Sequence, residues 1–153
     1  TSDADISRRR YLPIDLDAIR PSGTSSSKKQ HQAAIQKSRE VFKFIRNKGL
    51  PEPIVIDSGN GAHLLMPFDE PNDQNAKNMA QNILKTLADQ FNDEWVKVDE
   101  SVFNAARIMR LPGSMNRKGD HLPKYPHRLC QILSIPEPLK SHAKVALLSE
   151  EAA

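Results

Sequence analysis

Two aspartates, Asp15 and Asp17, stand two residues apart in the apolar stretch 11–17, which reads YLPIDLD. Side chains alternate along a strand, so both carboxylates would share one face while the leucines and isoleucine take the other. A third carboxylate, Asp99, ends the stretch 95–99, WVKVD. Carboxylates are the ligands that Mg²⁺ and Mn²⁺ prefer, so the three acids predict a metal site if the fold brings them together.

The spacing of these acids suits chemistry on phosphates. Asp15 and Asp17 would lie roughly 7 Å apart along a strand, close enough to hold two ions between them. Two ions about 3.5–4 Å apart can stabilise the attacking and leaving oxygens of a phosphoryl displacement. An Asp-x-Asp pair alone is more typical of the solvated face of a sheet. Asp99, on a strand expected to be its neighbour, favours the metal site.

A second group of candidate residues lies at 58–63, SGNGAH. His63 could donate to a triphosphate oxygen, although a partly buried sheet histidine bonded to a backbone carbonyl is the commoner case. Backbone N–H groups of the turn from Gly59 to Gly61 could form an anion-binding nest, and Ser58 could add a hydroxyl. We expect Asn60 and Gly61 to form the hairpin turn, because both residues tolerate positive φ.

The segment 106–120, ARIMRLPGSMNRKGD, is dense in basic residues and follows soon after Asp99. Such a loop is often merely solvated, but here it is placed to return over the acidic residues and neutralise phosphate charge. A helical turn would put Arg107 and Arg110 on one side. The candidate phosphate-binding residues are Arg107, Arg110, Asn116 and Lys118.

Hydrophobic periodicity predicts which elements position these residues. Strands are expected at 11–17, 54–57, 62–68, 95–99 and 127–134, and helices at 28–48 and 75–91. Pro13 should interrupt the first strand or place a bulge nearby. The order is β-α-β-β-α-β, an α+β split-βαβ fold of the ferredoxin or RRM type with a C-terminal strand extension. Its antiparallel sheet has the spatial order 4-1-3-2, with both helices on one face, so the acids and His63 would meet on the open face.

Composition limits the class of protein. The chain has 153 residues, enough for one domain, with a core at about 10–135 and a tail at 136–153. A single cysteine, Cys130, excludes a disulfide framework and reads as a small buried residue. No stretch approaches the ~20 apolar residues of a membrane helix, and no signal-peptide pattern is visible, so a cytoplasmic protein is expected. The arginines at 8–10 could contact a nucleic-acid backbone, but a flexible terminal charge run is the more usual interpretation.

The motifs IDLD, SGNGAHLL and VDESVFNAARIMRLPGSMNRKG resemble the archaeo-eukaryotic primase superfamily, specifically its primase–polymerase catalytic core. That family carries a hydrophobic-Asp-x-Asp motif, a small-x-His motif and a hydrophobic-Asp motif, in this order. Here they match Asp15 and Asp17, Gly61 to His63, and Val98-Asp99. The small position is Gly61 rather than Ser, which removes a hydroxyl there. The resemblance covers about residues 10–135.

The resemblance implies a template-directed nucleotidyltransferase, a DNA primase or polymerase, with Asp15, Asp17 and Asp99 holding two Mg²⁺ or Mn²⁺ ions. Its partners would be a single-stranded DNA template, a primer and (d)NTPs. The family's catalytic region has two subdomains, and this chain resembles the metal-bearing half. A fused or associated N-terminal subdomain and a helicase-type or other replication module are therefore expected, and it stays open whether this half alone is active.

Two other functions compete with this interpretation. A metal-dependent nuclease of the rolling-circle initiator type would need a paired-His motif, and only His63 is suitably placed. A non-catalytic RRM-like domain would bind nucleic acid on the open sheet through aromatic residues, and Tyr11 could stack a base there. The first strand instead offers carboxylates, which repel phosphate unless metal is present.

Overall fold

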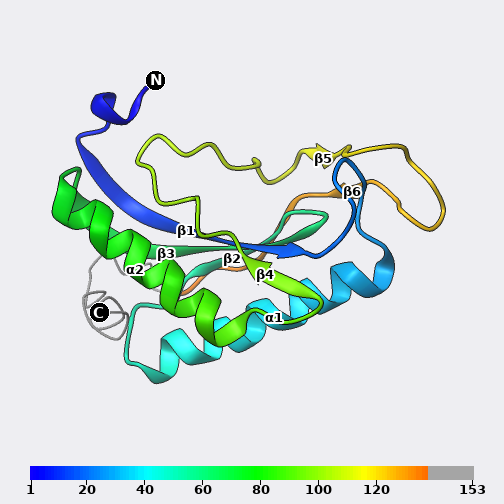
Figure 1. Cartoon of the computed structure of the whole chain (residues 1–153), viewed down its shortest axis with the longest axis horizontal. Helices are drawn as coiled ribbons and strands as arrows, with labels where there is room; N and C mark the ends of the chain where they lie inside the picture. The colour runs from blue at the N-terminus through cyan, green and yellow to red at the C-terminus, as the bar shows by residue number, and fades with distance from the viewer. Residues whose placement is uncertain (138–153) are drawn as a thin grey trace.

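Two α-helices cover one face of a five-stranded antiparallel sheet, and no α-helix among residues 1–137 covers the other (Figure 1). The computed structural model of the chain describes residues 1–137; of the predicted tail, 138–153 lie outside the described residues. The strand order is β4-β1-β3-β2-β7, so the predicted α+β fold and the order of its first four strands are confirmed. The elements of these two layers are β1 (Arg8–Ala18), α1 (Lys28–Asn47), β2 (Ile54–Asp57), β3 (Gly61–Pro71), α2 (Gln74–Phe91), β4 (Val96–Val98) and β7 (Gln131–Ser134).

Alternation along β1 separates the core from the open face. Leu12, Ile14 and Leu16 are at most 2% exposed and belong to the core under the helices. Asp15 and Asp17, the residues between and beyond them, are half-buried on the other face. Burying a large aliphatic side chain contributes about 1.5–3 kcal/mol, so this pattern fixes the register that points the acids away from the core.

The two helices begin and end where local signals predict. Ser27 caps α1 in a capping box with Gln30, and Gly49 just past its end has a φ of 71°. Asp73 caps α2 by accepting a hydrogen bond from the Ala76 N–H at 2.8 Å. Both helices lie within one residue of the predicted limits at each end.

β1 is longer than predicted, because the arginines at 8–10 are part of it and are not a flexible run. Arg9 is 8% exposed and donates to the Phe103 carbonyl at 2.6 Å and to Asn72 at 3.1 Å. The strand continues through Pro13 without interruption, and its bulge lies between Arg9 and Tyr11. The backbone of Pro13 faces the same side as that of Asp15, whose carbonyl faces β4. β4 is short and ends before it reaches Pro13, so the N–H that proline lacks would have no strand partner there.

The predicted strand 127–134 is two strands in different sheets. β6 (Arg128–Leu129) pairs with β5 (Met115–Asn116), while β7 pairs with β2. Between them Cys130 is fully buried, as predicted, and its N–H donates to the Ser114 carbonyl at 2.9 Å. Its carbonyl accepts from the Gly113 N–H at 2.7 Å, so contact with the segment before β5 extends to Cys130, and from Gln131 onward the chain pairs with β2 instead.

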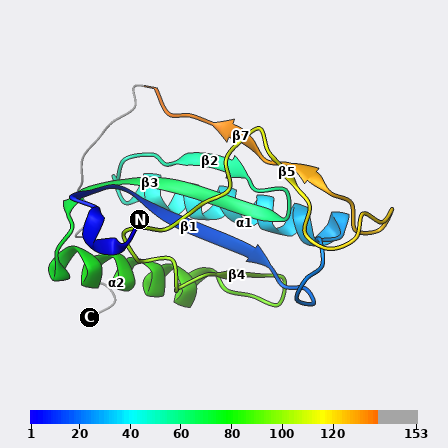
Figure 2. The same cartoon turned by 90° about the horizontal axis from the view of Figure 1, so that it is seen from above.

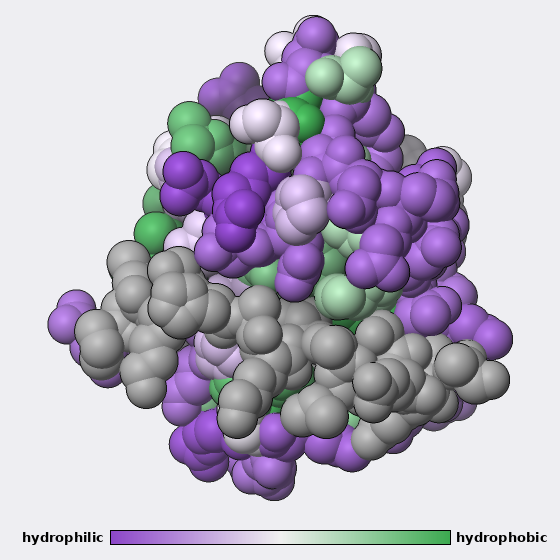
Figure 3. Space-filling model, turned by 90° about the vertical axis from the view of Figure 1, so that its left-hand side faces the viewer, coloured by the Kyte–Doolittle hydropathy of each residue, from purple (hydrophilic) through white to green (hydrophobic). Residues whose placement is uncertain are grey.

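The segment after β4 returns over the open face of the sheet, as the sequence predicts. In Figure 2 it crosses above β1 and β3 before reaching β5. The short 3-10 helix η1 (Asp3–Asp5) lies near its start, where the Asp3 carboxylate accepts from the Ala106 N–H at 2.8 Å. Among the coloured residues at the end of the molecule shown in Figure 3, most are hydrophilic, and the hydrophobic ones lie in separate patches. Within residues 1–137, neither helix has the length and apolar character that crossing a membrane requires.

Candidate metal centre

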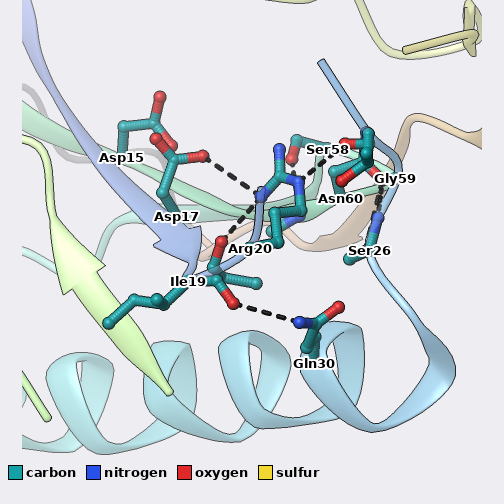
Figure 4. Close-up of polar contacts among 12 residues, drawn as sticks. Asp15, Asp17, Ile19, Arg20, Ser26, Gln30, Ser58, Gly59 and Asn60 are labelled. Carbon is teal, nitrogen blue, oxygen red and sulfur yellow. Dashed lines mark hydrogen bonds and ion pairs between the residues drawn. The ribbon is translucent and has the colours of Figure 1, made fainter. Parts of the chain in front are cut away.

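Three carboxylates from distant parts of the sequence meet on the open face of the sheet. Asp15 and Asp17 project from β1, and Asp99 follows β4 directly (Figure 4 shows the first two). The Asp99 N–H donates to the Asp15 carbonyl at 2.9 Å, which continues the β1–β4 pairing by one more residue. One oxygen of each acid lies within 4.8 Å of an oxygen of each of the others. The predicted meeting of the three acids is confirmed.

The charges of this acidic cluster (Asp15, Asp17 and Asp99) act on one another. Burial raises the pKa of Asp17, and the neighbouring Asp15 and Asp99 carboxylates raise it further. The positive charges of Arg20 and Lys118 oppose this shift. A cluster of oxygen donors whose negative charges repel is suited to a hard divalent cation, so the side chains present fit Mg²⁺ or Mn²⁺.

Arg20 is a neighbour of the acidic cluster that the sequence did not single out. Its side chain is 7% exposed, and its Nη1 lies 3.8 Å from Oδ1 of Asp17. It donates to the Ala18 carbonyl at 2.8 Å and to the Thr24 carbonyl at 2.9 Å. Figure 4 shows the side chain between Asp17 and the turn at 58–60. The sequence signal for Arg20 was its position at a strand end, just before the turn-forming residues PSG. The direction of its side chain, however, depends on how that turn folds.

His63 lies beside the acidic cluster, directly opposite Asp15 in the pairing of β1 with β3. Its side chain is 9% exposed, and Nε2 is 3.4 Å from Oδ1 of Asp15. The other ring nitrogen, Nδ1, has no hydrogen-bond partner within residues 1–137. The histidine is thus oriented toward the acids by the sheet.

A pocket of 240 Å³ lies between the acids and the segment that crosses over them. Asp15, His63 and Asp99 form part of its wall, and Arg107 and Arg110 form another part. Arg107 donates to the Ser101 hydroxyl at 3.0 Å, and that hydroxyl donates to Asp99 at 2.7 Å. The chain at 107–110 has no helical turn, so the two arginines are not aligned in that way. The two arginines border the same pocket because the extended segment runs along it.

Three other candidate residues, Ser58, Gly61 and Asn116, form or contact the turn between β2 and β3. The positive φ of the hairpin belongs to Gly59, at 88°, and not to Asn60 or Gly61. The N–H groups of Gly59 and Gly61 already donate to Asp57 and Ser58. The Ser58 carbonyl accepts from Asn116 Nδ2 at 2.7 Å, so Ser58 and Asn116 hold this turn against β5.

Gly61 has a packing reason to be glycine. A Cβ at this position would lie 2.3 Å from the Leu16 carbonyl oxygen, closer than any real contact. The small residue of the motif therefore lets β1 and β3 approach each other next to Asp17.

Arg128 joins three segments in the same region, a role that sequence reasoning did not assign. Its Nη1 donates to the Ser26 carbonyl at 2.9 Å and to the Gly59 carbonyl at 3.2 Å. Lys118 is anchored nearby through its carbonyl, which accepts from Ser25 at 2.6 Å. These contacts connect the start of α1, the β2–β3 turn and the β5–β6 hairpin.

No protein-family model matches the chain. No curated protein matches it significantly either. Among solved structures it is similar to the polymerase domain of Mycobacterium tuberculosis ligase D in complex with DNA, with a TM-score of 0.48 and 24% sequence identity. The match covers 78% of this chain and 43% of that chain, so the chain spans less than half the length of that structure.

Proposed function

We propose that the chain is the metal-bearing part of a metal-dependent nucleotidyltransferase. Within that class, the motif resemblance favours a primase–polymerase, which joins nucleotides on a single-stranded DNA template. The observation that carries the proposal is the acidic cluster, whose three oxygens lie within 4.8 Å of one another on the sheet face that no α-helix of residues 1–137 covers.

The acidic cluster would hold two Mg²⁺ or Mn²⁺ ions, with Asp15, Asp17 and Asp99 as ligands. Bound ions of this kind lower the pKa of a 3′-hydroxyl and neutralise charge on the phosphates of a nucleotide. The side chains around the pocket would position the triphosphate. Arg107 and Arg110 suit bidentate contacts with phosphate oxygens, and His63 offers one N–H donor. Lys118 adds a point charge near Asp17.

The residues of the turn receive a different role in this proposal from the one the sequence suggested. Ser58, Gly61 and Asn116 act by holding the β2–β3 turn and the close approach of β1 and β3. Their effect on nucleotide binding is then indirect, through the position of His63 and Asp17.

Nucleotide incorporation tests the proposal directly. The chain, alone and fused to its natural flanking sequence, is incubated with Mn²⁺, labelled nucleotides and a single-stranded template, with and without a primer. We expect labelled product that disappears in Asp17→Asn and persists in the surface control Lys85→Gln. Product without a primer identifies a primase, and product only with one identifies an extending polymerase.

A parallel Mn²⁺ titration separates the proposal from the non-catalytic alternative. We expect Mn²⁺ binding that Asp15→Asn and Asp17→Asn each weaken by at least about tenfold, since each removes a charged ligand. No Asp17-dependent Mn²⁺ binding, together with no incorporation by the longer chain, would contradict the proposal and leave a domain that only binds nucleic acid.

A further inference from the structure

A large groove lies on the helix side of the sheet, away from the acidic cluster. Its volume is 1260 Å³, and it runs between the exposed face of α1 and the strands β2 and β7. Segment 123–128 contributes to its wall at one end. In Figure 2, β7 is the outermost strand on the side away from β4, and α1 is seen behind β2 and β3.

The walls of this groove are strongly basic. α1 contributes Lys28, Arg39, Lys43 and Arg46, and the other wall contributes Lys124 and Arg128. Within residues 1–137, none of the four cations from α1 forms a hydrogen bond or an ion pair. Of the carboxylates in the described part of the chain, only that of Asp57 lines the groove, and its Oδ1 lies 2.9 Å from Nε2 of His31. An anion entering the groove would therefore meet cations without competing carboxylates.

The positions of the cations along α1 suit an extended polyanion. Arg39, Lys43 and Arg46 are exposed and follow one another at intervals of about one helical turn, roughly 4.5–6 Å along the axis. A single small anion would need its cations to converge. Cations in a row instead match a chain of regularly spaced negative charges, such as a phosphodiester backbone.

Apolar side chains between these cations distinguish a single strand from a duplex. Ile35 and Phe42 of α1 and Leu133 of β7 line the groove, and Leu133 is 45% exposed. A single strand can lay its bases on aromatic and apolar side chains, whereas a duplex keeps its bases stacked inside. An acidic peptide would satisfy the cations, but it has no planar groups for Phe42 unless its sequence supplies them.

One basic segment connects the groove with the acidic cluster. Residues 117–128 begin with Arg117 and Lys118 and end with Arg128 in the groove. The charge of Lys118 opposes the rise in the pKa of Asp17. Lys124 lies between them and also lines the groove. A nucleic-acid strand that left the acidic cluster along this segment would enter the groove. Asp120 is the one acidic residue of the segment that it would pass.

We propose that the α1–β7 groove binds single-stranded nucleic acid, with its phosphates on Arg39, Lys43 and Arg46 and its bases over Phe42. The inference deepens the proposed function, on which it rests for the identity of the strand as template. Binding in the groove itself requires neither a metal ion nor the acidic cluster.

The test measures binding of a fluorescent 20-nucleotide oligo(dT) by anisotropy, in EDTA and across a series of salt concentrations. The groove variant is Arg39→Gln/Lys43→Gln/Arg46→Gln. The control Lys29→Gln/Lys48→Gln/Lys85→Gln removes the same charge at positions that do not line the groove. Thermal unfolding confirms that both variants fold. A duplex of the same length and poly-glutamate serve as competitors.

We expect the groove variant to bind at least about tenfold more weakly than wild type, and the control less than about twofold. Its salt dependence should fall by about 2 in slope, since each phosphate contact with a single strand contributes about 0.7. Phe42→Ala should weaken binding without changing that slope. Equal losses in both triple variants, or an unchanged groove variant, would overturn the proposal.

The competitors decide what the groove holds. Stronger competition by poly-glutamate than by oligo(dT) at equal charge would assign the groove to an acidic protein and overturn the proposal. Equal or better binding of the duplex would overturn the single-strand assignment. Retained groove binding in a chain that shows neither Asp17-dependent Mn²⁺ binding nor nucleotide incorporation would support this inference while contradicting the proposed function, so the two failures are distinguishable.

Discussion

At the scale of single residues, the ionised form of Asp17 is destabilised by burial and by the neighbouring carboxylates. Its pKa is raised chiefly by burial and then by the Asp15 carboxylate. Between the unfolded value, near 3.8, and the raised folded value, the folded chain keeps a proton that the unfolded chain has released. The free energy of unfolding therefore falls as pH rises through this window, and it stays lower at neutral pH.

Asp17→Asn should consequently raise the melting temperature of the metal-free chain at pH 7. The gain should be a few degrees, because the carboxylate is 38% exposed and solvent screens the repulsion. It should shrink as the pH is lowered through the folded pKa toward 3.8. Thermal unfolding in EDTA at several pH values measures this. A variant less stable than wild type at pH 7 would show that the acids do not repel one another.

For a substitution of Arg20 we predict the opposite effect, a loss of stability. Arg20→Gln leaves the Ala18 and Thr24 carbonyls without their donors and removes a positive charge near Asp17. The free energy of unfolding should drop by about 1–3 kcal/mol, the cost of leaving buried polar groups unpartnered. Urea denaturation measures the loss, and Arg117→Gln, at an exposed arginine, is the control. Equal stability of the two variants would rule out this role of Arg20.

The acids of the site could be predicted from sequence, and the contacts of Arg20 could not. Alternation along one strand fixes the face of Asp15 and Asp17 whatever the rest of the chain does. The direction of Arg20 depends on the loop at 21–27, which has no periodicity. Ser58 and Asn116 were candidates for phosphate contacts, yet both form hydrogen bonds within the β2–β3 turn or to it. The sequence shows that a side chain can form hydrogen bonds, but it does not show with which partner.

At the scale of elements, the close approach of β1 and β3 keeps Asp17 in place. Gly61→Ala would put a Cβ against the Leu16 carbonyl oxygen and push the two strands apart. We expect a loss of about 1–3 kcal/mol in unfolding free energy together with weaker Mn²⁺ binding. Gly49→Ala is the matched control, because its φ of 71° is strained for alanine but its Cβ would meet no atom within 4 Å. Unchanged Mn²⁺ binding in Gly61→Ala would show that the acids do not depend on this packing.

Element boundaries were predictable where a strand or helix has its own pattern. Both helices and β2 match within a residue, since caps and apolar spacing mark them. The N-terminal part of β1 was missed because Arg9 is charged, and its burial depends on the Phe103 carbonyl far along the chain. The division of 127–134 at Cys130 was missed because β5 has two residues, too few for any periodicity.

At the scale of the whole molecule, a bound cation should stabilise the fold. Mn²⁺ at a hundred times its dissociation constant should add about 2.7 kcal/mol to the free energy of unfolding, because the unfolded chain does not assemble the acidic cluster. The melting temperature of the wild-type chain should therefore rise with Mn²⁺, while that of Asp17→Asn should rise much less. An equal rise in both would place the cation elsewhere.

The most direct measurement of the central claim is anomalous diffraction from crystals of the chain grown with Mn²⁺. The account predicts anomalous density bonded to carboxylate oxygens of Asp15, Asp17 and Asp99, and its loss in crystals of Asp17→Asn. Density bound only to other residues, or ordered carboxylates with no density between them at saturating Mn²⁺, would contradict it.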